Sequence, residues 1–280
     1  MDTDYIINVM SNAMDIALKF YDLQLTSVLK DDNSPVTNAD HCVCLFIKSA
    51  LKSKYPDIPY VSEEDYKENI SYDYYWLVDP IDGTKEFLLK KDEFTINIAL
   101  IKKNNPIFGI VGVPAYGTIY YADHDDSLSN NAYKFDILTE QTEIIKARKI
   151  DKNNTIIMVS NSHNNKLTEE FISKLDGKKT CKSAGSSLKI LLIAEGKADI
   201  YPRLEGTCEW DTAAAHYILD KAGGKIVTYP YSNPYSDLNF LNNGELLYNK
   251  LSGPINMPIY GNKYENKKIQ NPFFICYGSE

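Results

Sequence analysis

Apolar residues recur with the spacing of an amphipathic helix in two segments near the start of the chain. The first segment covers 4–21, where Thr3 or Asp4 can cap the helix. The second covers about 39–54 and is stopped by Pro56. The predicted inward-facing positions are Ile6, Met10, Met14 and Ala17 in the first helix, and Val43, Phe46, Ile47, Ala50 and Leu51 in the second.

Short apolar runs bounded by turn residues predict strands through the rest of the first half. The first of these runs, at 75–79, ends in Asp79, and a shorter run precedes it at Tyr60-Val61. Turn signals at Asn104-Asn105-Pro106 and Tyr116-Gly117 separate the later ones. The first half therefore reads as two helices followed by a β-meander, with strands at 75–79, 94–101, 107–113 and 117–122.

Strands and helices alternate in the second half, which favours an α/β layer. Residues 123–154 are polar without a clear period, and residues 230–272 are rich in Asn, Pro and Tyr and are predicted to be loop. We place a domain boundary near 150, between an α+β half (1–150) and an α/β half (151–280). The predicted strands are 155–160, 198–201, 225–228 and 273–277, and the helices are 167–175, 186–195 and 211–222.

Composition narrows the class of protein. The 280 residues are 44% hydrophobic, which suffices for a packed core, and no apolar run approaches the roughly 18 residues of a membrane span. The first 25 residues lack a secretory signal pattern. A net charge of −8 lowers the expectation of nucleic-acid binding and suits a chain that holds cations. We expect a cytoplasmic protein with no nucleic-acid partner and no integral membrane segment.

Cysteine and histidine spacing favours oxygen ligands for any metal. The five cysteines are odd in number and include no CxxC pair, so we expect them to be reduced. The four histidines show no HExxH or similar spacing. A bound metal is therefore expected to be a hard cation.

The segment from Trp76 to Glu86 carries the most specific candidate chemistry. An apolar strand delivers Asp79, and a turn with Gly83 brings Asp82 close, with the Ile81 carbonyl between the two carboxylates. Two carboxylates so close repel each other unless a cation lies between them. If a helix starts at Gly83 and Thr84, their N–H groups form an anion cradle. This arrangement suits a metal-assisted phosphate hydrolase, although taken alone it is also compatible with an ordinary acidic turn.

Three further segments add carboxylates, and each also has a simpler interpretation. Asp40 and Asp211 each stand at a predicted helix start, where an aspartate is a common cap. Glu63 and Glu64 follow the short strand at Tyr60-Val61 and could be solvated loop charges.

The order of these segments resembles the lithium-sensitive, magnesium-dependent phosphatase superfamily of inositol monophosphatase. The pattern is TxAD ending at Asp40, SEE from Ser62, WxxDPIDGTxxF from Trp76 and WDxAA from Trp210. Within the superfamily the chain resembles the CysQ-type 3′(2′),5′-bisphosphate nucleotidases, and it has GTKEF where inositol monophosphatases usually have GTTNF. Region 231–262 is longer than the family pattern. The segments that carry the closer resemblance are 32–37, 61–65, 77–87, 93–100, 185–189 and 194–203.

The resemblance implies a layered α-β-α-β-α sandwich, within the α+β or α/β class, and a set of site residues. Two or three Mg²⁺ ions would be held by Glu63, Asp79, the Ile81 carbonyl, Asp82 and Asp211, with Asp79 bridging two ions. Asp40 and Thr84 would orient and deprotonate the attacking water, with Glu64 behind the metal ligands. The Gly83 and Thr84 amides would bind phosphate. The nucleotide candidates are Ser162, His163, Gly185, Ser186, Lys189 and Arg203.

Some of these nucleotide candidates also have structural interpretations. Lys189 could be a helix-surface charge, Arg203 a strand-edge ion pair and His163 a loop histidine without a function.

The activity implied is hydrolysis of the 3′-phosphate of adenosine 3′,5′-bisphosphate to AMP and phosphate, with lithium sensitivity and a place in sulfur metabolism. An inositol or sugar phosphatase with the same metal site is the enzymatic alternative. A catalytically silent nucleotide- or metal-binding regulator is the non-enzymatic one.

Overall fold

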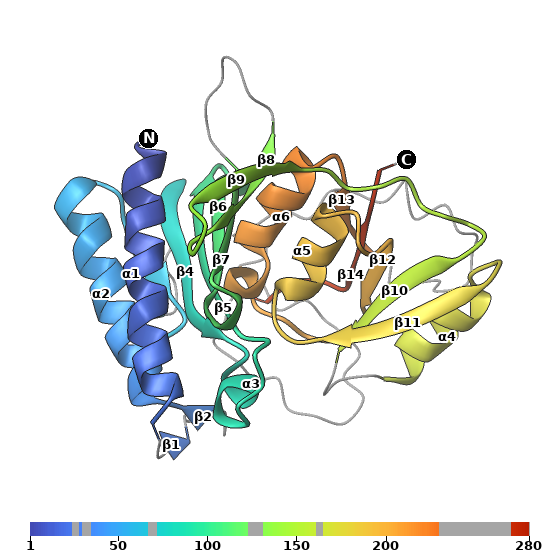
Figure 1. Cartoon of the computed structure of the whole chain (residues 1–280), viewed down its shortest axis with the longest axis horizontal. Helices are drawn as coiled ribbons and strands as arrows, with labels where there is room; N and C mark the ends of the chain where they lie inside the picture. Colours follow the sequence, from blue (N-terminus) through green and yellow to red (C-terminus); the bar gives the residue numbers. More distant parts are fainter. Residues whose placement is uncertain are drawn as a thin grey trace.

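Helices and two sheets alternate in layers across the molecule (Figure 1). The computed structural model describes residues 1–23, 28–29, 35–66, 72–122, 131–160, 165–229 and 270–279. A two-stranded antiparallel ribbon, β1 (Val28–Leu29) and β2 (Pro35–Val36), lies in the connection between the first two helices.

The larger sheet has seven strands that follow one another in chain order from β3 to β9. β3 pairs parallel with β4, and the remaining pairs are antiparallel, which confirms the β-meander. The last two strands fall in the polar region where the sequence showed no period, and most of their residues are only partly buried or exposed. The strands are β3 (Tyr60–Ser62), β4 (Tyr74–Asp82), β5 (Thr95–Lys102), β6 (Asn105–Val113), β7 (Thr118–Ala122), β8 (Ala132–Asp136) and β9 (Gln141–Ile145).

Helices α1 (Thr3–Tyr21) and α2 (Asn38–Lys54) cover one face of this sheet. Asp2 caps α1 by accepting the Tyr5 N–H at 3.0 Å. Gly112 of β6 lets α1 approach closely, because a Cβ there would lie 2.7 Å from the sulfurs of Met10 and Met14. Both helices form where the apolar periodicity predicts them, and each begins one residue before the predicted start.

The smaller sheet has five strands in the order β11-β10-β12-β14-β13. β10 pairs parallel with β11 and β12, and β14 pairs antiparallel with β12 and β13. The sequence did not predict β11, a polar edge strand in which three consecutive residues from Cys181 are exposed. The strands are β10 (Thr155–Ser160), β11 (Lys179–Ala184), β12 (Ile200–Arg203), β13 (Lys225–Thr228) and β14 (Phe274–Tyr277).

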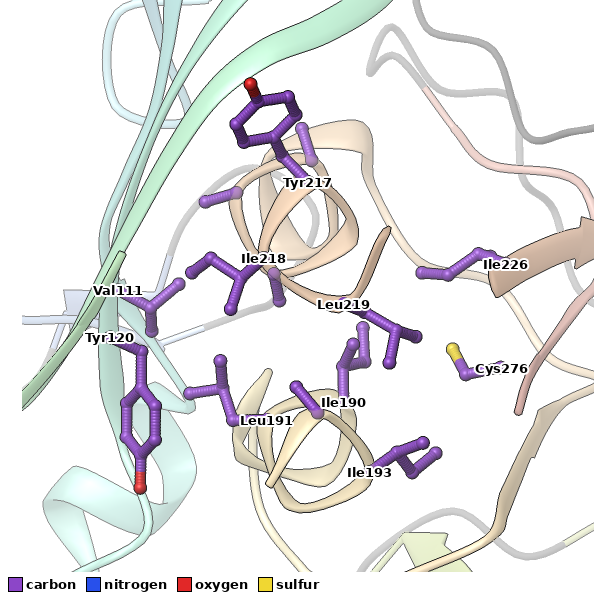
Figure 2. Close-up of a cluster of buried hydrophobic side chains, with 14 of the residues drawn as sticks. Val111, Tyr120, Ile190, Leu191, Ile193, Tyr217, Ile218, Leu219, Ile226 and Cys276 are labelled. Carbon is purple, nitrogen blue, oxygen red and sulfur yellow. The ribbon is translucent and has the colours of Figure 1, made fainter. Parts of the chain in front are cut away.

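Helices α5 (Leu188–Ala194) and α6 (Ala213–Lys221) lie between the two sheets (Figure 2). Ile218 and Leu191 point toward Val111 of the larger sheet, while Leu219 points toward Ile226 of the smaller one. Gly109 of β6 allows this close packing, because a Cβ there would lie 2.3 Å from the Ala214 carbonyl oxygen.

Helix α4 (Lys166–Lys174) completes the layers on the outer face of the smaller sheet, where its Phe171 joins Ile157 and Ile200 in a separate apolar cluster. The order helix, sheet, helix, sheet, helix confirms the expected α-β-α-β-α sandwich. The strands of the larger sheet precede residue 150 and those of the smaller sheet follow it, but one apolar cluster contains residues of both halves. The division into two domains stays a prediction.

Several boundaries differ from the sequence prediction for local reasons. The helix expected from residue 186 begins at Leu188, because Ser186 has a left-handed φ of +43°. The helix expected from 211 begins as a 3₁₀ turn, Glu209–Asp211, before α6. The loop expected at 230–272 lies almost entirely outside the described residues.

Two expectations from composition can be compared with the structure. All five cysteines are free thiols, as predicted. Among the residues described, no helix has the length and apolar character needed to cross a bilayer.

Candidate active site

Two aspartates reach the same side of β4 because the strand carries a bulge. Side chains alternate across a strand, so residues three apart normally face opposite ways. Asp79 pairs with Asn97 and Asp82 with Thr95, so three steps on β4 match two on β5. One extra residue in the strand turns the second aspartate to the face of the first. The strand predicted to end at Asp79 therefore continues to Asp82.

The turn after β4 depends on Gly83, whose φ of +88° lies in the left-handed region. A short helix, α3 (Thr84–Leu88), starts there, as the anion-cradle interpretation required. Gly83 and Thr84 both line a cavity at this helix start. Their proposed contact with phosphate stays a prediction.

Asp211 joins the two strand aspartates from the other half of the chain. Asp79, Asp82 and Asp211 can each place one carboxylate oxygen within 4.8 Å of the other two. Asp211 is not itself the N-cap that its sequence position suggested: Cys208 is the N-cap of the 3₁₀ turn, and Asp211 Oδ2 accepts the Cys208 N–H at 2.9 Å as the other half of the capping box. Capping and clustering therefore coexist at this residue.

Burial makes this carboxylate cluster costly when it is charged. Burial raises the pKa of Asp82 to about 6, an effect that the positive charge of Lys189 opposes. Burial, together with the charges of Asp82 and Glu63, holds the pKa of Asp211 well above its usual value. A divalent cation would relieve both effects. Clustered carboxylates offer the hard oxygen ligands that Mg²⁺ prefers, so the donor set fits that ion.

Glu63 and Glu64 occupy different surroundings although they are adjacent in the chain. Glu63 follows β3 and lines the same cavity as the aspartates, but it lies outside the group of three. Glu64 approaches His41, with its Oε2 4.0 Å from the His41 Nδ1, and is not among the residues that line the cavity. Glu63 is thus better placed than Glu64 to contact a ligand in the cavity.

Asp40 and Thr84, 44 residues apart in the chain, are brought together by packing of α2 beside the turn. Asp40 belongs to the capping box of α2 and accepts the Thr37 N–H at 2.8 Å. Its other oxygen, Oδ1, lies 3.5 Å from the Thr84 hydroxyl, which can donate to it. The same hydroxyl lies 3.3 Å from the Ile81 carbonyl oxygen. Asp40 therefore completes the capping box of α2, in which Thr37 is the N-cap, and also reaches the site.

The two predicted cations, Lys189 and Arg203, line the cavity together with Lys85, and the volume of the cavity is about 310 Å³. Lys189 is 4% exposed and donates to the carbonyl oxygens of Ser186 at 2.7 Å and Ala184 at 3.2 Å. Its burial lowers the pKa of its ammonium group to about 8. Arg203 donates to the Gly206 carbonyl oxygen at 2.9 Å. Lys189 is thus not a helix-surface charge.

The remaining nucleotide candidates divide into two groups. Gly185 and Ser186 line the cavity, on the loop that precedes α5. Ser162 and His163 lie outside the described residues.

Sequence reasoning assigned no role to four residues that surround Asp82 and its loop. Thr95 and Asn97 lie on β5 opposite Asp82 and Asp79, and both are buried. Ser187 donates its N–H to Asp82 Oδ2 at 2.7 Å, and Glu93 accepts the Gly185 N–H at 3.0 Å. Two buried polar residues at alternate positions of an apolar strand were the available signal for Thr95 and Asn97.

The chain is similar in sequence to one family of known proteins. The sequence model of the inositol monophosphatase family matches residues 3–255. The 3′(2′),5′-bisphosphate nucleotidase CysQ of Buchnera aphidicola is 38% identical over 252 residues, covering 86% of this chain and 91% of that protein. CysQ of Escherichia coli K12 is 38% identical over 229 residues, covering 80% and 89%.

Solved structures extend the similarity to the fold. CysQ from Bacteroides thetaiotaomicron, a bacterial member of the inositol monophosphatase family, has a TM-score of 0.75 at 30% identity and covers 100% of this chain and 98% of its own. An IMPase from Thermotoga maritima has a TM-score of 0.69 at 22% identity, covering 81% and 86%.

Proposed function

The chain belongs to the inositol monophosphatase family, and we propose that within it the protein is a magnesium-dependent 3′(2′),5′-bisphosphate nucleotidase. It removes the 3′-phosphate of adenosine 3′,5′-bisphosphate and yields AMP and phosphate. The observation that carries this proposal is the meeting of Asp79, Asp82 and Asp211 in a cavity that also contains Lys189 and Arg203. Such a cavity pairs a metal site with positive charge for an anionic substrate.

The metal site is proposed to consist of Glu63, Asp79, the Ile81 carbonyl, Asp82 and Asp211, and to hold two or three Mg²⁺ ions. When bound, Mg²⁺ neutralises charge on the phosphate and lowers the pKa of water. The three aspartates supply the closely spaced oxygens, and Glu63 lies at the same cavity.

Thr84 and Asp40 are proposed to orient the attacking water and accept its proton. Because the Thr84 hydroxyl can donate to Asp40 Oδ1, its oxygen keeps a lone pair for a proton from the water. Thr84 then passes its own proton to Asp40, the water oxygen bonds to phosphorus as the bond to the 3′-oxygen breaks, and the leaving 3′-oxygen takes up a proton from solvent water. General-base assistance of this kind typically contributes about 10²–10⁴-fold to a rate.

Lys189 and Arg203 are proposed to bind the 5′-phosphate, which the reaction leaves in place. The Arg203 Nε is buried and has no hydrogen-bond partner within the described residues, so this guanidinium retains a donor. Lys189 uses its ammonium group on two carbonyls yet still lines the cavity. A 5′-phosphate provides the oxygens that such donors bind well.

The free thiols support a reducing compartment, and we propose the cytoplasm. The resemblance to the family also leads us to propose lithium sensitivity and a place in sulfur metabolism.

A direct comparison of substrates tests the proposal. Phosphate release is measured with adenosine 3′,5′-bisphosphate, inositol 1-phosphate, fructose 1,6-bisphosphate and AMP, each at several Mg²⁺ concentrations. We expect adenosine 3′,5′-bisphosphate to be preferred by at least about tenfold in kcat/KM, with AMP accumulating as an unreacted product. A tenfold preference for inositol 1-phosphate or the sugar ester would overturn the substrate assignment, and absence of turnover on all four would favour a silent regulator.

A further inference from the structure

The loop 185–187 between β11 and α5 forms part of the cavity wall and contacts Asp82 directly. The Ser187 N–H donates to Asp82 Oδ2 at 2.7 Å. The Thr95 hydroxyl and the Asn97 amide reach the same oxygen at 3.5 Å each. The loop thus supplies the shortest of these three hydrogen bonds, and all three converge on one oxygen of the carboxylate.

The loop has a backbone conformation that it would not adopt on its own. Ser186 has a φ of +43°, in the left-handed region that L-residues avoid. Conformations of this kind persist only where the surroundings hold them. The contacts that hold residues 185–187 therefore also determine where the Ser187 N–H points.

Glu93 makes those contacts from the segment between α3 and β5. Its carboxylate Oε2 accepts the Gly185 N–H at 3.0 Å, and its backbone carbonyl accepts the Ser186 hydroxyl. The two backbones are so close that a Cβ at position 185 would lie 2.6 Å from the Glu93 carbonyl oxygen. Lys189 holds the loop at a different point, through the Ala184 and Ser186 carbonyls.

We propose that Glu93 is a positioning residue: by holding the loop 185–187 it presents the Ser187 N–H to Asp82 and orients that carboxylate for a divalent cation. Groups that hydrogen-bond to a metal ligand typically change metal affinity or activity by about 10–100-fold when removed. The inference deepens the proposed function and rests on it for the identity of the cation. Glu93 acts through Ser187 and is not itself a ligand.

The inference can be tested without turnover by measuring how tightly Mn²⁺ binds to the metal-stripped, substrate-free full chain. Electron paramagnetic resonance monitors this binding. Glu93→Ala removes the carboxylate acceptor, and we expect the Kd for Mn²⁺ to rise by about 10–100-fold. Glu93→Gln keeps a neutral oxygen that accepts a weaker hydrogen bond, so a smaller rise is expected. Asp92→Asn is the matched control, because Asp92 accepts from the Tyr21 hydroxyl and takes no part in the loop.

The outcomes separate this inference from the proposed function. Mn²⁺ affinity within twofold of wild type in Glu93→Ala would overturn the inference, and so would an equal loss in Asp92→Asn, which would indicate an effect of net charge. Thermal unfolding shows whether each variant is folded. If Glu93→Ala does not fold, the test uses Glu93→Gln instead, and a Kd for Mn²⁺ within twofold of wild type in that variant would overturn the inference. A wild-type protein that binds Mn²⁺ in a Glu93-dependent way but does not hydrolyse adenosine 3′,5′-bisphosphate would remove the proposed function alone.

Discussion

Asp82 accepts three hydrogen bonds on its Oδ2, and its carboxylate lies close to those of Asp79 and Asp211. Burial raises the pKa of Asp82 to about 6, so the folded protein disfavours its charged form compared with an exposed aspartate, although the group is still mostly charged at pH 7. Stability is given up at such a position because the site needs a charged ligand. Substitutions at Asp82 should therefore affect activity and stability in opposite directions.

For Asp82→Asn we expect kcat to fall by at least about 100-fold. A metal ligand should contribute at least as much to activity as a residue that hydrogen-bonds to such a ligand, whose loss typically costs about 10–100-fold. Without metal, the variant should melt at least about 2 °C higher at pH 7, because a buried charge is gone. The raised pKa of Asp82 in the folded state means that its cost is absent below pH 4 and complete above about pH 6. The gain in melting temperature should therefore disappear near pH 4. An active Asp82→Asn would contradict the metal site.

The Thr84 hydroxyl can be removed or kept by single substitutions. We expect Thr84→Ala to lower kcat by about 100-fold or more, whereas Thr84→Ser should stay within about tenfold of wild type, since it retains the donor to Asp40. Steady-state kinetics at saturating Mg²⁺ measure both. Equal activity of the two variants would show that the hydroxyl carries no proton.

At the scale of elements, the site depends on where strands and helices end. The bulge in β4 turns Asp82 toward Asp79, and the 3₁₀ turn before α6 delivers Asp211. Helix α6 is buried between the sheets over nearly its whole length, and a single histidine, His216, lies within it at 3% exposed. The placement of Asp211 therefore depends on a helix that contains a buried titratable group.

Burial lowers the pKa of His216 to about 4, from about 6.5 in an unfolded chain. Between these values the unfolded state binds the extra proton, so stability falls as the pH decreases. This group alone should remove about 3 kcal/mol of unfolding free energy between pH 6.5 and 4. Denaturant unfolding of wild type and His216→Asn at several pH values measures it. The same slope in both proteins would show that His216 does not titrate in this way.

At the scale of the whole molecule, the cavity contains residues from both halves of the chain. Helices α5 and α6 come from the second half but pack against the sheet of the first half, as Gly109 permits. The connection between the sheets is held by Arg148, whose Nε donates to the fully buried Asp199 at 2.8 Å. The two halves thus share a core and a site.

This shared core predicts one cooperative unfolding transition for the full chain, because neither half buries its apolar faces alone. Differential scanning calorimetry measures it, with equal calorimetric and van't Hoff enthalpies expected. Two resolved transitions would instead support independent domains divided near residue 150. Gly109→Ala, whose Cβ would overlap the Ala214 carbonyl oxygen, should lower the melting temperature of that single transition.

Much of the fold could be predicted from the chain because its information is local. Apolar periodicity identified α1 and α2, and apolar runs with turn residues identified β4 to β7. Within the seven- and five-stranded sheets, β8, β9 and β11 were not predicted; these strands are largely polar or partly exposed, so burial leaves only a weak pattern in them. Their pairing partners stabilise them, and those partners are not encoded nearby.

The family pattern of the carboxylates and the turn at Gly83 after the acidic strand can both be recognised from the residues alone. The meeting of Asp211 with Asp79 and Asp82, the burial of Lys189 and the contact of Glu93 with the loop beside Asp82 become visible only in the folded chain. The difference lies in how far apart the interacting residues are along the chain. Turns and caps depend on neighbouring residues, whereas convergence across about 90 to 130 positions depends on how sheets and helices pack.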